Sequence, residues 1–254
     1  MDWRNTLEAA FDSDSFRAEL PCDEILPALV DMARRFEIDP NDLLATVDGC
    51  LLDCNDVLRF ETEADAYHYA DLVATSVGRA TLAILGGTQP RNDSLEQAIF
   101  SCGRAFQWTN FLRDILEDYR RERIYFPMSD FSCAGLAPND WLALLAAGKK
   151  GRAVRRFRLH DPHDPLVKFF TIEFARTEKL YAEADRLDQA IAEDARRMFL
   201  LMKNVYRAIF QKIRENPGAV FERRVRLTLW EKFRFCRCRS KFSELRPKTP
   251  PFSE

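Results

Sequence analysis

The 254-residue sequence lacks the features that mark several large classes of protein. Its 9 Gly are too few for collagen-like or glycine-rich low-complexity structure. Lys and Arg number 38 against 40 Asp and Glu, and the net charge of −2 excludes the basic field that nucleic-acid-binding proteins carry. The longest stretch without a charge, residues 80–90, is far shorter than the roughly 20 apolar residues of a membrane-spanning helix. We therefore expect neither a nucleic-acid partner nor a membrane span.

Signatures of several enzyme classes are missing as well. The sequence contains no GxSxG, no P-loop and no GxGxxG, so hydrolase, nucleotide triphosphatase and Rossmann functions have no support. The 7 Cys are odd in number and scattered, with no CxxC pair, which favours reduced thiols over a disulfide framework. The first residues include acids and no apolar segment, unlike a signal peptide. We expect a cytoplasmic protein.

Helical periodicity is what the sequence has in abundance. Apolar residues recur at helical spacing, and no stretch alternates as a strand would. Asp39-Pro40 is typical of a helix start and Gly86-Gly87 of a helix end. The pattern predicts helices over residues 23–36, 40–58, 63–85, 94–121, 139–147, 165–192, 193–215 and 219–241. We expect one all-α domain, a helical bundle over residues 1–241, followed by a disordered tail over 242–254.

Two local details refine this prediction. Ser94 is followed three residues later by Gln97, a capping-box pattern that places the start of the helix at Ser94. Residues 122–137 contain Pro127 and Gly135 and interrupt the helical pattern, so we expect an ordered loop there.

The helix predicted over residues 94–121 carries a polar stripe. On a helical wheel, Gln107, Asn110, Asp114 and Asp118 fall in one arc. Periodicity alone favours a solvated polar face. Asp114 and Asp118 are four residues apart, however, so two like charges project from one face and repel unless a cation lies between them. Mg²⁺ binds oxygen ligands of this kind, which makes a metal site the functional alternative.

Residues 107–127 combine Q-x-x-N-x-x-R-D-x-x-x-D with a following R-x-Y-F-P, from Gln107 to Pro127. This combination resembles the second aspartate-rich motif of the squalene/phytoene synthase family. Residues 47–53 (VDGCLLD), 69–78 (YADLVATSVG) and 220–227 (VFERRVRL) are similar to three further segments of that family. The resemblance extends from about residue 20 to residue 235.

The resemblance implies an isoprenoid synthase fold, a helical bundle around a central cavity, and prenyltransferase activity. In that family two isoprenoid diphosphates, farnesyl or geranylgeranyl, condense head to head through a cyclopropyl intermediate with Mg²⁺-assisted loss of diphosphate. The product is presqualene diphosphate and squalene, or phytoene. Some relatives use NADPH in a second half-reaction, and NADPH use stays open here because no motif in the sequence identifies a site for it.

Residue roles follow from the matching motif positions. The resemblance implies that Asp114 and Asp118 bind Mg²⁺ or Mn²⁺. It implies catalytic or orienting roles for Tyr69, Gln107, Asn110, Arg113 and Tyr125. It implies substrate binding by Val73, Ala74, Val77, Gly78, Arg123 and Arg224.

The match departs from the family near the N-terminus. Family members have a first aspartate-rich motif on a helix that faces the second, and no DxxxD precedes Asp114 here. Asp48 and Asp53 match a different, non-metal element of the family. Three explanations stay open: the first helix precedes this sequence, the chain is a catalytically inactive lipid-binding or assembly module, or a partner chain completes the site. Glu122 also replaces the Gly that the family has before Arg123.

The predicted C-terminal helix is basic and amphipathic. It interleaves Arg223, Arg226 and Lys232 with Leu229 and Trp230. Such a helix can lie on an anionic membrane surface, and a packed helix with solvated Arg is the alternative. Peripheral membrane contact through this helix is therefore one expectation.

Overall fold

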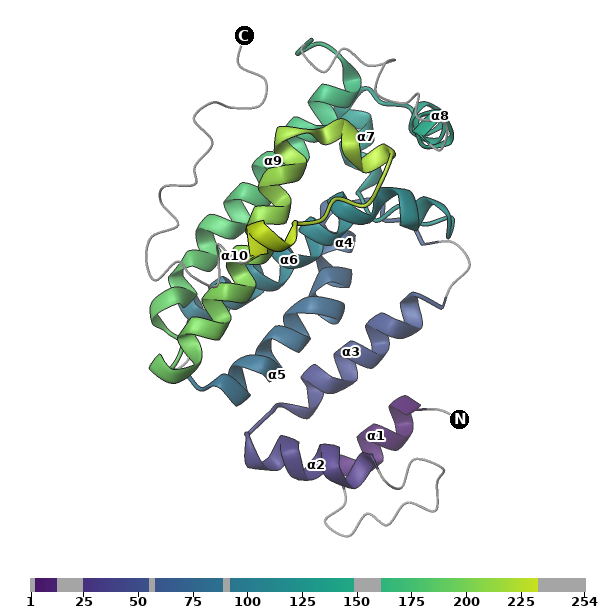
Figure 1. Ribbon diagram of the computed structural model, residues 1–254. Coiled ribbons are helices and arrows are strands. Elements are labelled where there is room, and N and C mark those ends of the chain that lie inside the picture. The colour runs from purple at the N-terminus through teal and green to yellow at the C-terminus, as the bar shows by residue number, and fades with distance from the viewer. Residues whose placement is uncertain (1–2, 13–24, 55–57, 89–91, 149–160, 233–254) are drawn as a thin grey trace.

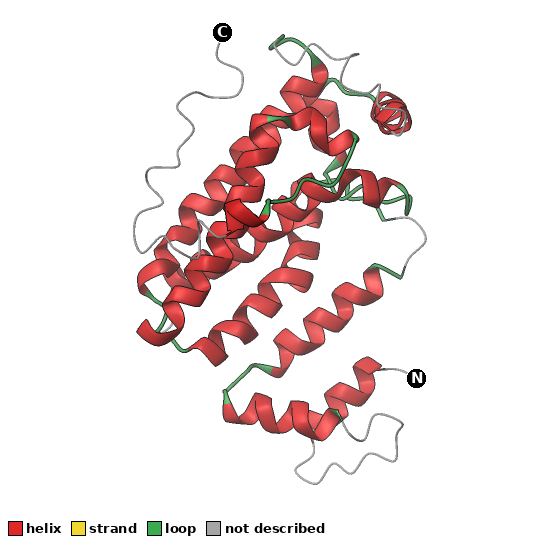
Figure 2. Cartoon of the chain, in the orientation of Figure 1, coloured by secondary structure: helices red, strands yellow, loops and turns green. Residues whose placement is uncertain are grey.

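The computed structural model describes residues 3–12, 25–54, 58–88, 92–148 and 161–232 (Figure 1). Within these ranges the chain forms helices and turns and no strand, as Figure 2 shows, apart from isolated bridges that join Arg59 to Ile124 and Gly87 to Ile191. In chain order the elements are α1 (Trp3–Asp12), α2 (Leu26–Arg35), α3 (Pro40–Leu52), α4 (Glu63–Ala70), the π-helix η1 (Asp71–Thr75), α5 (Ser76–Leu85), α6 (Asp93–Tyr119), α7 (Met128–Ala134), α8 (Pro138–Gly148), α9 (Pro165–Ala184), the 3₁₀ helix η3 (Asp185–Gln189), α10 (Glu193–Glu215) and the 3₁₀ helix η4 (Pro217–Phe221). The all-α prediction is confirmed.

Helix α6, with 27 residues, is the axis of the bundle (Figure 1). It packs against α9 and α10, and also against η1 and α5. Helix α3 packs on η1 and α5 in turn, and α1, α2 and α3 enclose a separate small core that includes Leu7, Leu26 and Leu44. Side chains of α6 therefore reach both the packed interior and the space between α5 and α10.

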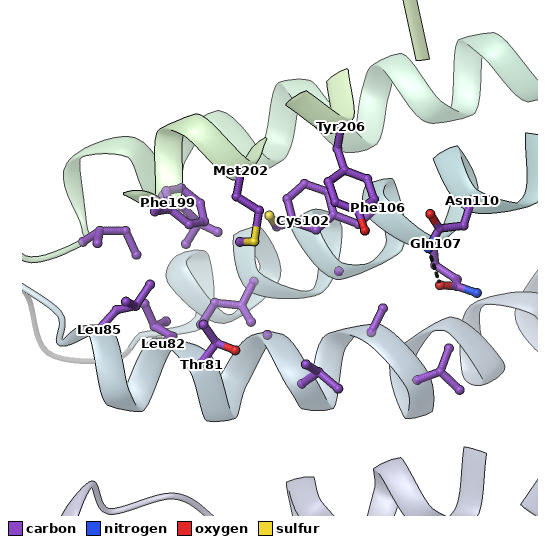
Figure 3. Close-up of a pocket in the computed structure, with 18 residues that line it drawn as sticks. Thr81, Leu82, Leu85, Cys102, Phe106, Gln107, Asn110, Phe199, Met202 and Tyr206 are labelled. Carbon is purple, nitrogen blue, oxygen red and sulfur yellow. Dashed lines mark hydrogen bonds between the residues drawn. The ribbon is translucent and has the colours of Figure 1, made fainter. Parts of the chain in front are cut away.

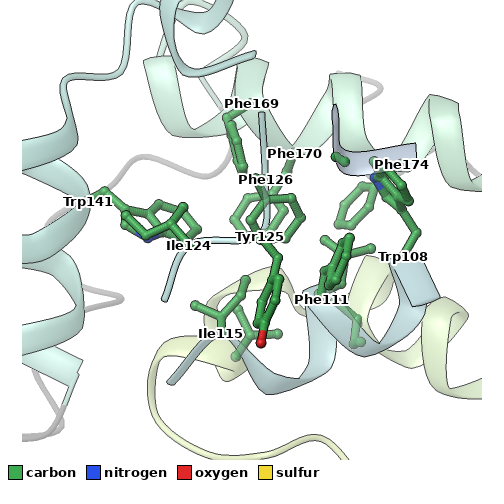
Figure 4. Packing of buried hydrophobic residues seen from close by; sticks show 14 of the residues in the cluster. Trp108, Phe111, Ile115, Ile124, Tyr125, Phe126, Trp141, Phe169, Phe170 and Phe174 are labelled. Carbon is green, nitrogen blue, oxygen red and sulfur yellow. The ribbon is translucent and has the colours of Figure 1, made fainter. Parts of the chain in front are cut away.

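The main core is largely aromatic (Figure 4). Trp108 and Phe111 of α6 have ring centroids 5.2 Å apart, and Phe111 lies 6.1 Å from Phe126. Phe126 contacts Phe169 of α9 edge to face at 5.3 Å. These rings are buried, and truncating one of them typically costs about 3–5 kcal/mol. Aromatic packing of this kind holds α6 at a defined position against α9.

Two glycines allow η1 to lie close to its neighbours. A Cβ at Gly103 of α6 would lie 2.6 Å from Oγ1 of Thr75 and 2.7 Å from its Cα. A Cβ at Gly49 of α3 would lie 2.5 Å from Cγ1 of Val73. The η1 segment, which carries two of the predicted substrate-binding residues, is thus held between α3 and α6 by close contact at these two glycines.

Several predicted elements need correction. Helix α6 begins at Asp93, because Oδ1 of Asn92 caps it by accepting from the Leu95 amide at 2.9 Å; Ser94 is not the cap. The predicted loop 122–137 contains helix α7, which Gly135 ends in the left-handed conformation. The single helix predicted over residues 63–85 contains the π-helical turn η1, where one bulged turn interrupts the α-helical hydrogen bonds.

The helix predicted over residues 219–241 is wrong in its described part. After η4, residues 222–228 are not helical, and only residues 229–232 form a helical turn. Val225 and Leu227 are buried while Arg226 is exposed, an alternation that an extended segment produces and a helix does not. Residues 233–254, which include the predicted disordered tail, lie outside the described residues.

Candidate active site

Two cavities meet along α6. The first, of about 170 Å³, is polar and is lined by Tyr69, Gln107, Asn110, Phe111, Arg113, Asp114, Asp118 and Tyr125. The second, of about 240 Å³, is mainly apolar and lies between α5, α6 and α10 (Figure 3). Gln107 and Asn110 line both cavities. One end of the combined space is therefore polar and charged, and the rest is apolar.

The structure brings together all the residues that the sequence predicted for the site. The seven predicted catalytic and metal-binding residues line the polar cavity. Val73, Ala74, Val77 and Gly78 line the apolar cavity. Arg123 and Arg224 line neither cavity but contact Tyr125 and Asp114, which do. The spatial grouping agrees with the predicted site, and the individual roles remain predictions.

Asp114 is held between two arginines. Arg113 donates from Nε to Oδ1 at 2.9 Å and from Nη2 to Oδ2 at 2.5 Å. Arg224 approaches from residues 222–228 with Nε 2.7 Å from Oδ1, and its Nη1 lies 3.2 Å from the carboxylate of Glu117. In this state both oxygens of Asp114 are engaged by guanidinium groups.

Asp118 and Asn110, in contrast, have side-chain oxygens without a partner among the described residues. The Asp118 carboxylate makes no hydrogen bond or ion pair with any residue that the structure describes. Burial raises the pKa of Asp118 to about 7, and the negative charge of Asp114 adds to the shift. The Asn110 amide donates to Oε1 of Gln107 at 3.2 Å, but its buried Oδ1 has no partner among the described residues. A carboxylate and an amide oxygen thus face the cavity unpaired.

This donor set fits a hard divalent cation. Asn110, Asp114 and Asp118 present oxygen ligands at successive turns of α6, and a cation would satisfy the unpaired Asn110 oxygen and relieve the repulsion between the two carboxylates. Across the described residues no group of three or more His, Cys, Asp and Glu side chains forms a metal cluster. Mg²⁺ is often bound by one or two carboxylates with the remaining positions filled by phosphate oxygens and water, so two carboxylates suffice for a site of that type.

Three aromatic residues that line the polar cavity, Tyr69, Phe111 and Tyr125, form an aromatic wall. Tyr125 stacks on Phe111 with ring centroids 5.0 Å apart and planes 3° from parallel, and Tyr69 stacks on Tyr125 at 5.2 Å. Burial is the main cause that raises the pKa of Tyr69, and it raises the pKa of Tyr125 to about 12. Both phenols are therefore neutral at physiological pH.

Asp53 is the residue of this region that the sequence did not place in the site. It caps the C-terminus of α3, and its carboxylate accepts hydrogen bonds from both Tyr69 and Tyr125. The only signal in the sequence was its position in the segment 47–53, which matched the family without a stated role. Glu122 adopts a positive φ of 61°, a conformation that favours glycine and accounts for the glycine that the family has there.

Apolar side chains make up the walls of the second cavity. Phe106 of α6 stacks on Tyr206 of α10 at 4.5 Å next to the polar end, and Cys102, Met202 and Phe199 follow along the cavity (Figure 3). Met202 and Val77 keep 39% and 45% of their surfaces exposed, so apolar residues reach the opening between α5 and α10. The cavity offers an elongated apolar molecule one continuous surface.

Comparison with known proteins agrees with this arrangement. The sequence profile of the family described as squalene/phytoene synthase matches residues 1–231. A phytoene synthase of Arthrospira platensis is 30% identical over 241 residues, which cover 91% of this chain and 70% of that protein. The chloroplastic phytoene synthase 2 of Solanum lycopersicum is 28% identical over 87% of this chain and 65% of its own length. For the chloroplastic phytoene synthase 1 of Arabidopsis thaliana the chain spans about half the relative, 48% of its length.

Solved structures show the same fold. The squalene synthase HpnC from Alicyclobacillus acidocaldarius superposes with a TM-score of 0.67 at 21% identity, covering 85% of this chain and 72% of that one. A dehydrosqualene synthase solved with a ligand superposes with a TM-score of 0.70 at 22% identity, covering 91% and 73%. With the profile match over most of its length, this chain belongs to the squalene/phytoene synthase family.

Proposed function

We propose that this chain catalyses the head-to-head condensation of two isoprenoid diphosphates, farnesyl or geranylgeranyl, with loss of diphosphate, to give either phytoene or presqualene diphosphate, from which a hydride supplied by NADPH would give squalene. The observation that carries the proposal is the junction of the polar and apolar cavities at Gln107 and Asn110. A prenyl diphosphate has one highly charged end and a long apolar chain, and the two cavities offer a surface to each. Membership of the family supports the same class of reaction.

The polar cavity supplies groups for the diphosphate end. Arg113 and Arg224 lie at Asp114, and Arg123 lies beside Tyr125, so three guanidinium groups surround the place where phosphate oxygens would bind. Asn110, Asp114 and Asp118 would hold Mg²⁺ or Mn²⁺. When bound, the cation neutralises negative charge that develops on the departing diphosphate.

The aromatic wall suits the carbon that the diphosphate leaves. The C1–O bond breaks with both electrons departing on the diphosphate, so an allylic cation remains at C1. The double bond of the second prenyl chain then supplies the electron pair of the new C–C bond, and one proton is lost as the cyclopropyl ring closes. Tyr69, Phe111 and Tyr125 present electron-rich ring surfaces beside the polar cavity, and a ring face stabilises a nearby cation by about 0.5–2 kcal/mol.

One incubation tests the proposal. The purified chain is mixed with farnesyl or geranylgeranyl diphosphate, Mg²⁺ and NADPH, and released diphosphate and condensed prenyl product are measured together. We expect both to form, and chelation of the metal to abolish both. Asp118→Asn should lower kcat/KM about 10²–10³-fold, because it removes a charged oxygen ligand whose effect is realised in the transition state. Asp93→Asn, at an exposed position of the same helix, is the matched control and should leave activity unchanged.

Absence of product from the folded chain would contradict this proposal. The alternative function, a catalytically inactive family member that binds lipid or an assembly partner, would then be favoured. Binding of a non-hydrolysable prenyl diphosphate without turnover would identify the lipid-binding form of that alternative.

We also propose peripheral contact of residues 223–232 with an anionic membrane. Leu229 and Trp230 keep 73% and 80% of their surfaces exposed, next to the exposed Arg223, Arg226 and Lys232. Each basic residue near an anionic surface contributes about 1 kcal/mol, and an exposed Trp fits the interfacial region. None of the helices in the described ranges has the length and apolar content to cross a bilayer.

Vesicle sedimentation tests the membrane contact. The chain should sediment with phosphatidylglycerol vesicles and not with phosphatidylcholine vesicles. Trp230→Ala should weaken sedimentation, whereas Trp3→Ala, at another exposed tryptophan, should not. Equal sedimentation of the two variants would contradict a contact through this segment.

A further inference from the structure

The carboxylate of Asp53 connects two tyrosines of the polar cavity that come from different parts of the chain. The hydroxyl of Tyr69, at the end of α4, lies 2.9 Å from Oδ2 and 3.0 Å from Oδ1 of Asp53. The hydroxyl of Tyr125, which follows α6, lies 2.9 Å from Oδ1. Asp53 itself does not line the cavity, whereas both tyrosines do. One carboxylate therefore sits behind the aromatic wall and accepts from two of its members.

Arg123 completes the cluster from the other side. Its Nη2 donates to the backbone carbonyl of Asp53, its Nη1 lies 3.7 Å from Oδ1, and the same nitrogen donates to the Tyr125 hydroxyl at 3.4 Å. The Asp53 side chain nevertheless keeps 31% of its surface exposed. A partly exposed ion pair contributes little to the stability of a fold, so stability alone does not account for a carboxylate in this position.

The hydrogen bonds decide what the tyrosines present to the cavity. A phenol has a single hydroxyl proton, and in both Tyr69 and Tyr125 that proton points toward Asp53. The ring faces, and the hydroxyl lone pairs that Arg123 does not engage, are left for the cavity side. Because the two rings also stack at 5.2 Å, the carboxylate sets their orientation as a pair. The result is a wall that is electron-rich and donates no proton to the cavity.

We propose that Asp53 is a positioning residue of the condensation, which holds Tyr69 and Tyr125 as hydrogen-bond donors to itself so that their electron-rich surfaces face the cationic carbon. This role rests on the proposed function, since it matters only for a substrate that develops positive charge. Asp53 touches neither substrate nor metal in this account. It acts through the two tyrosines.

The kinetic test compares Asp53→Asn with Asp48→Asn in the full-length chain. Both replace an aspartate of the same α3 region by its amide, but Asp48 pairs with Arg4 at 2.7 Å and contacts neither tyrosine. We expect Asp53→Asn to lower kcat about tenfold with little change in KM for farnesyl diphosphate, because a charge-assisted hydrogen bond is replaced by a weaker one while the diphosphate site is intact. Asp48→Asn should match the wild-type chain.

A double-mutant cycle separates positioning from a merely structural effect. If Asp53 acts through Tyr125, combining Asp53→Asn with Tyr125→Phe should cost little more kcat than the more severe single change. Additive losses would overturn the role. Should Asp53→Asn fail to fold, the variant with both Tyr69→Phe and Tyr125→Phe removes the same hydrogen bonds while keeping the carboxylate, and we expect the same loss of kcat.

A spectroscopic readout is independent of turnover. Tyrosine labelled with ¹³C at Cζ gives one NMR signal per ring, and Tyr69→Phe and Tyr125→Phe assign the two signals. Both should shift in Asp53→Asn and stay in place in Asp48→Asn. Unshifted signals, or kinetics of Asp53→Asn equal to those of Asp48→Asn in an active enzyme, would overturn the role of Asp53 alone. A wild-type chain that releases no diphosphate would overturn the proposed function, and the catalytic meaning of Asp53 with it.

Discussion

Acidic side chains on the two sides of α6 differ in whether they are paired with basic or hydrogen-bonding groups. On the side facing α9, the buried Glu173 accepts a hydrogen bond from the Trp108 indole at 2.8 Å, and Arg176 contacts Glu173 at 2.8 Å and Asp130 at 2.7 Å. On the side facing the cavity, Asp114 is engaged by arginines, but the carboxylate of Asp118 has no hydrogen bond or ion pair with any described residue.

The difference indicates which acidic groups stabilise the fold and which are available to a ligand. Buried polar groups are normally paired within the protein, and the Arg176 cluster follows that rule for all but one of its oxygens: one guanidinium joins α4, α7 and α9, and Oε1 of Glu173 alone lacks a partner among the described residues. An unpaired carboxylate beside an unpaired amide oxygen departs from the rule. The departure marks a place where a ligand supplies the missing partner, and the following predictions test the contrast.

The largest effect should come from removing Arg176, whose guanidinium pairs with acidic side chains on the α9 side of α6. Arg176→Met leaves the carboxylates of Glu173 and Asp130 buried without their cation, which should lower the free energy of unfolding by about 3–5 kcal/mol. Lys179→Met, at an exposed position one turn later in α9, is the matched control and should change it by less than about 0.5 kcal/mol. Denaturant titration measures both. Similar losses in the two variants would show that the cluster does not hold the fold.

A smaller effect on stability should distinguish the close contact between α6 and η1 at Gly103 from the open cavity at Gly78. Gly103→Ala places a Cβ 2.6 Å from Thr75 and should destabilise the chain by about 1–3 kcal/mol. Gly78→Ala, also in a helix, meets no atom within 4 Å and should stabilise it by about 0.5–1 kcal/mol. Thermal unfolding of the two variants gives the comparison, and a destabilising Gly78→Ala would indicate that the cavity is filled.

The paired cluster should also make stability depend on pH. Burial raises the pKa of Glu173 from 4.5 to about 8, and the nearby Asp130 carboxylate acts in the same direction. At pH values between these two pKa values, Glu173 keeps its proton in the folded chain and has released it in the unfolded chain. The free energy of unfolding therefore falls as pH rises. Glu173→Gln should flatten this slope in denaturant titrations from pH 5 to about 8. A wild-type chain whose stability rises over this range would refute the assignment.

The smallest predicted effect concerns the cavity side. The guanidinium of Arg224 pairs with the Asp114 carboxylate, which would also bind a metal ion, so Arg224 should compete with the metal for this carboxylate. Arg224→Gln should therefore tighten Mn²⁺ binding about fivefold in the absence of diphosphate, as expected for removal of a partly exposed ion pair. Arg223→Gln, at the exposed neighbouring position, is the control. Calorimetric titration that finds weaker Mn²⁺ binding in Arg224→Gln would contradict competition.

Some structural details escaped prediction for local reasons. Asn92 caps α6 in place of Ser94, since two positions separated by one residue offered similar capping side chains. Residues 222–228 read as part of a basic amphipathic helix, yet burial of Val225 and Leu227 against the core holds them extended. In both cases the local propensity was compatible with two outcomes and the packing selected one.

The sequence by itself determined most of the helices and the polar stripe from Gln107 to Asp118, because residues three and four apart share a helix face whatever the helix packs against. Only the tertiary structure decided that Arg224 meets Asp114 across 110 residues of chain and that Asp53 meets Tyr69 and Tyr125. No local period relates such positions. They become neighbours because the aromatic core and the close contacts at Gly49 and Gly103 bring α3, η1 and α6 to one place.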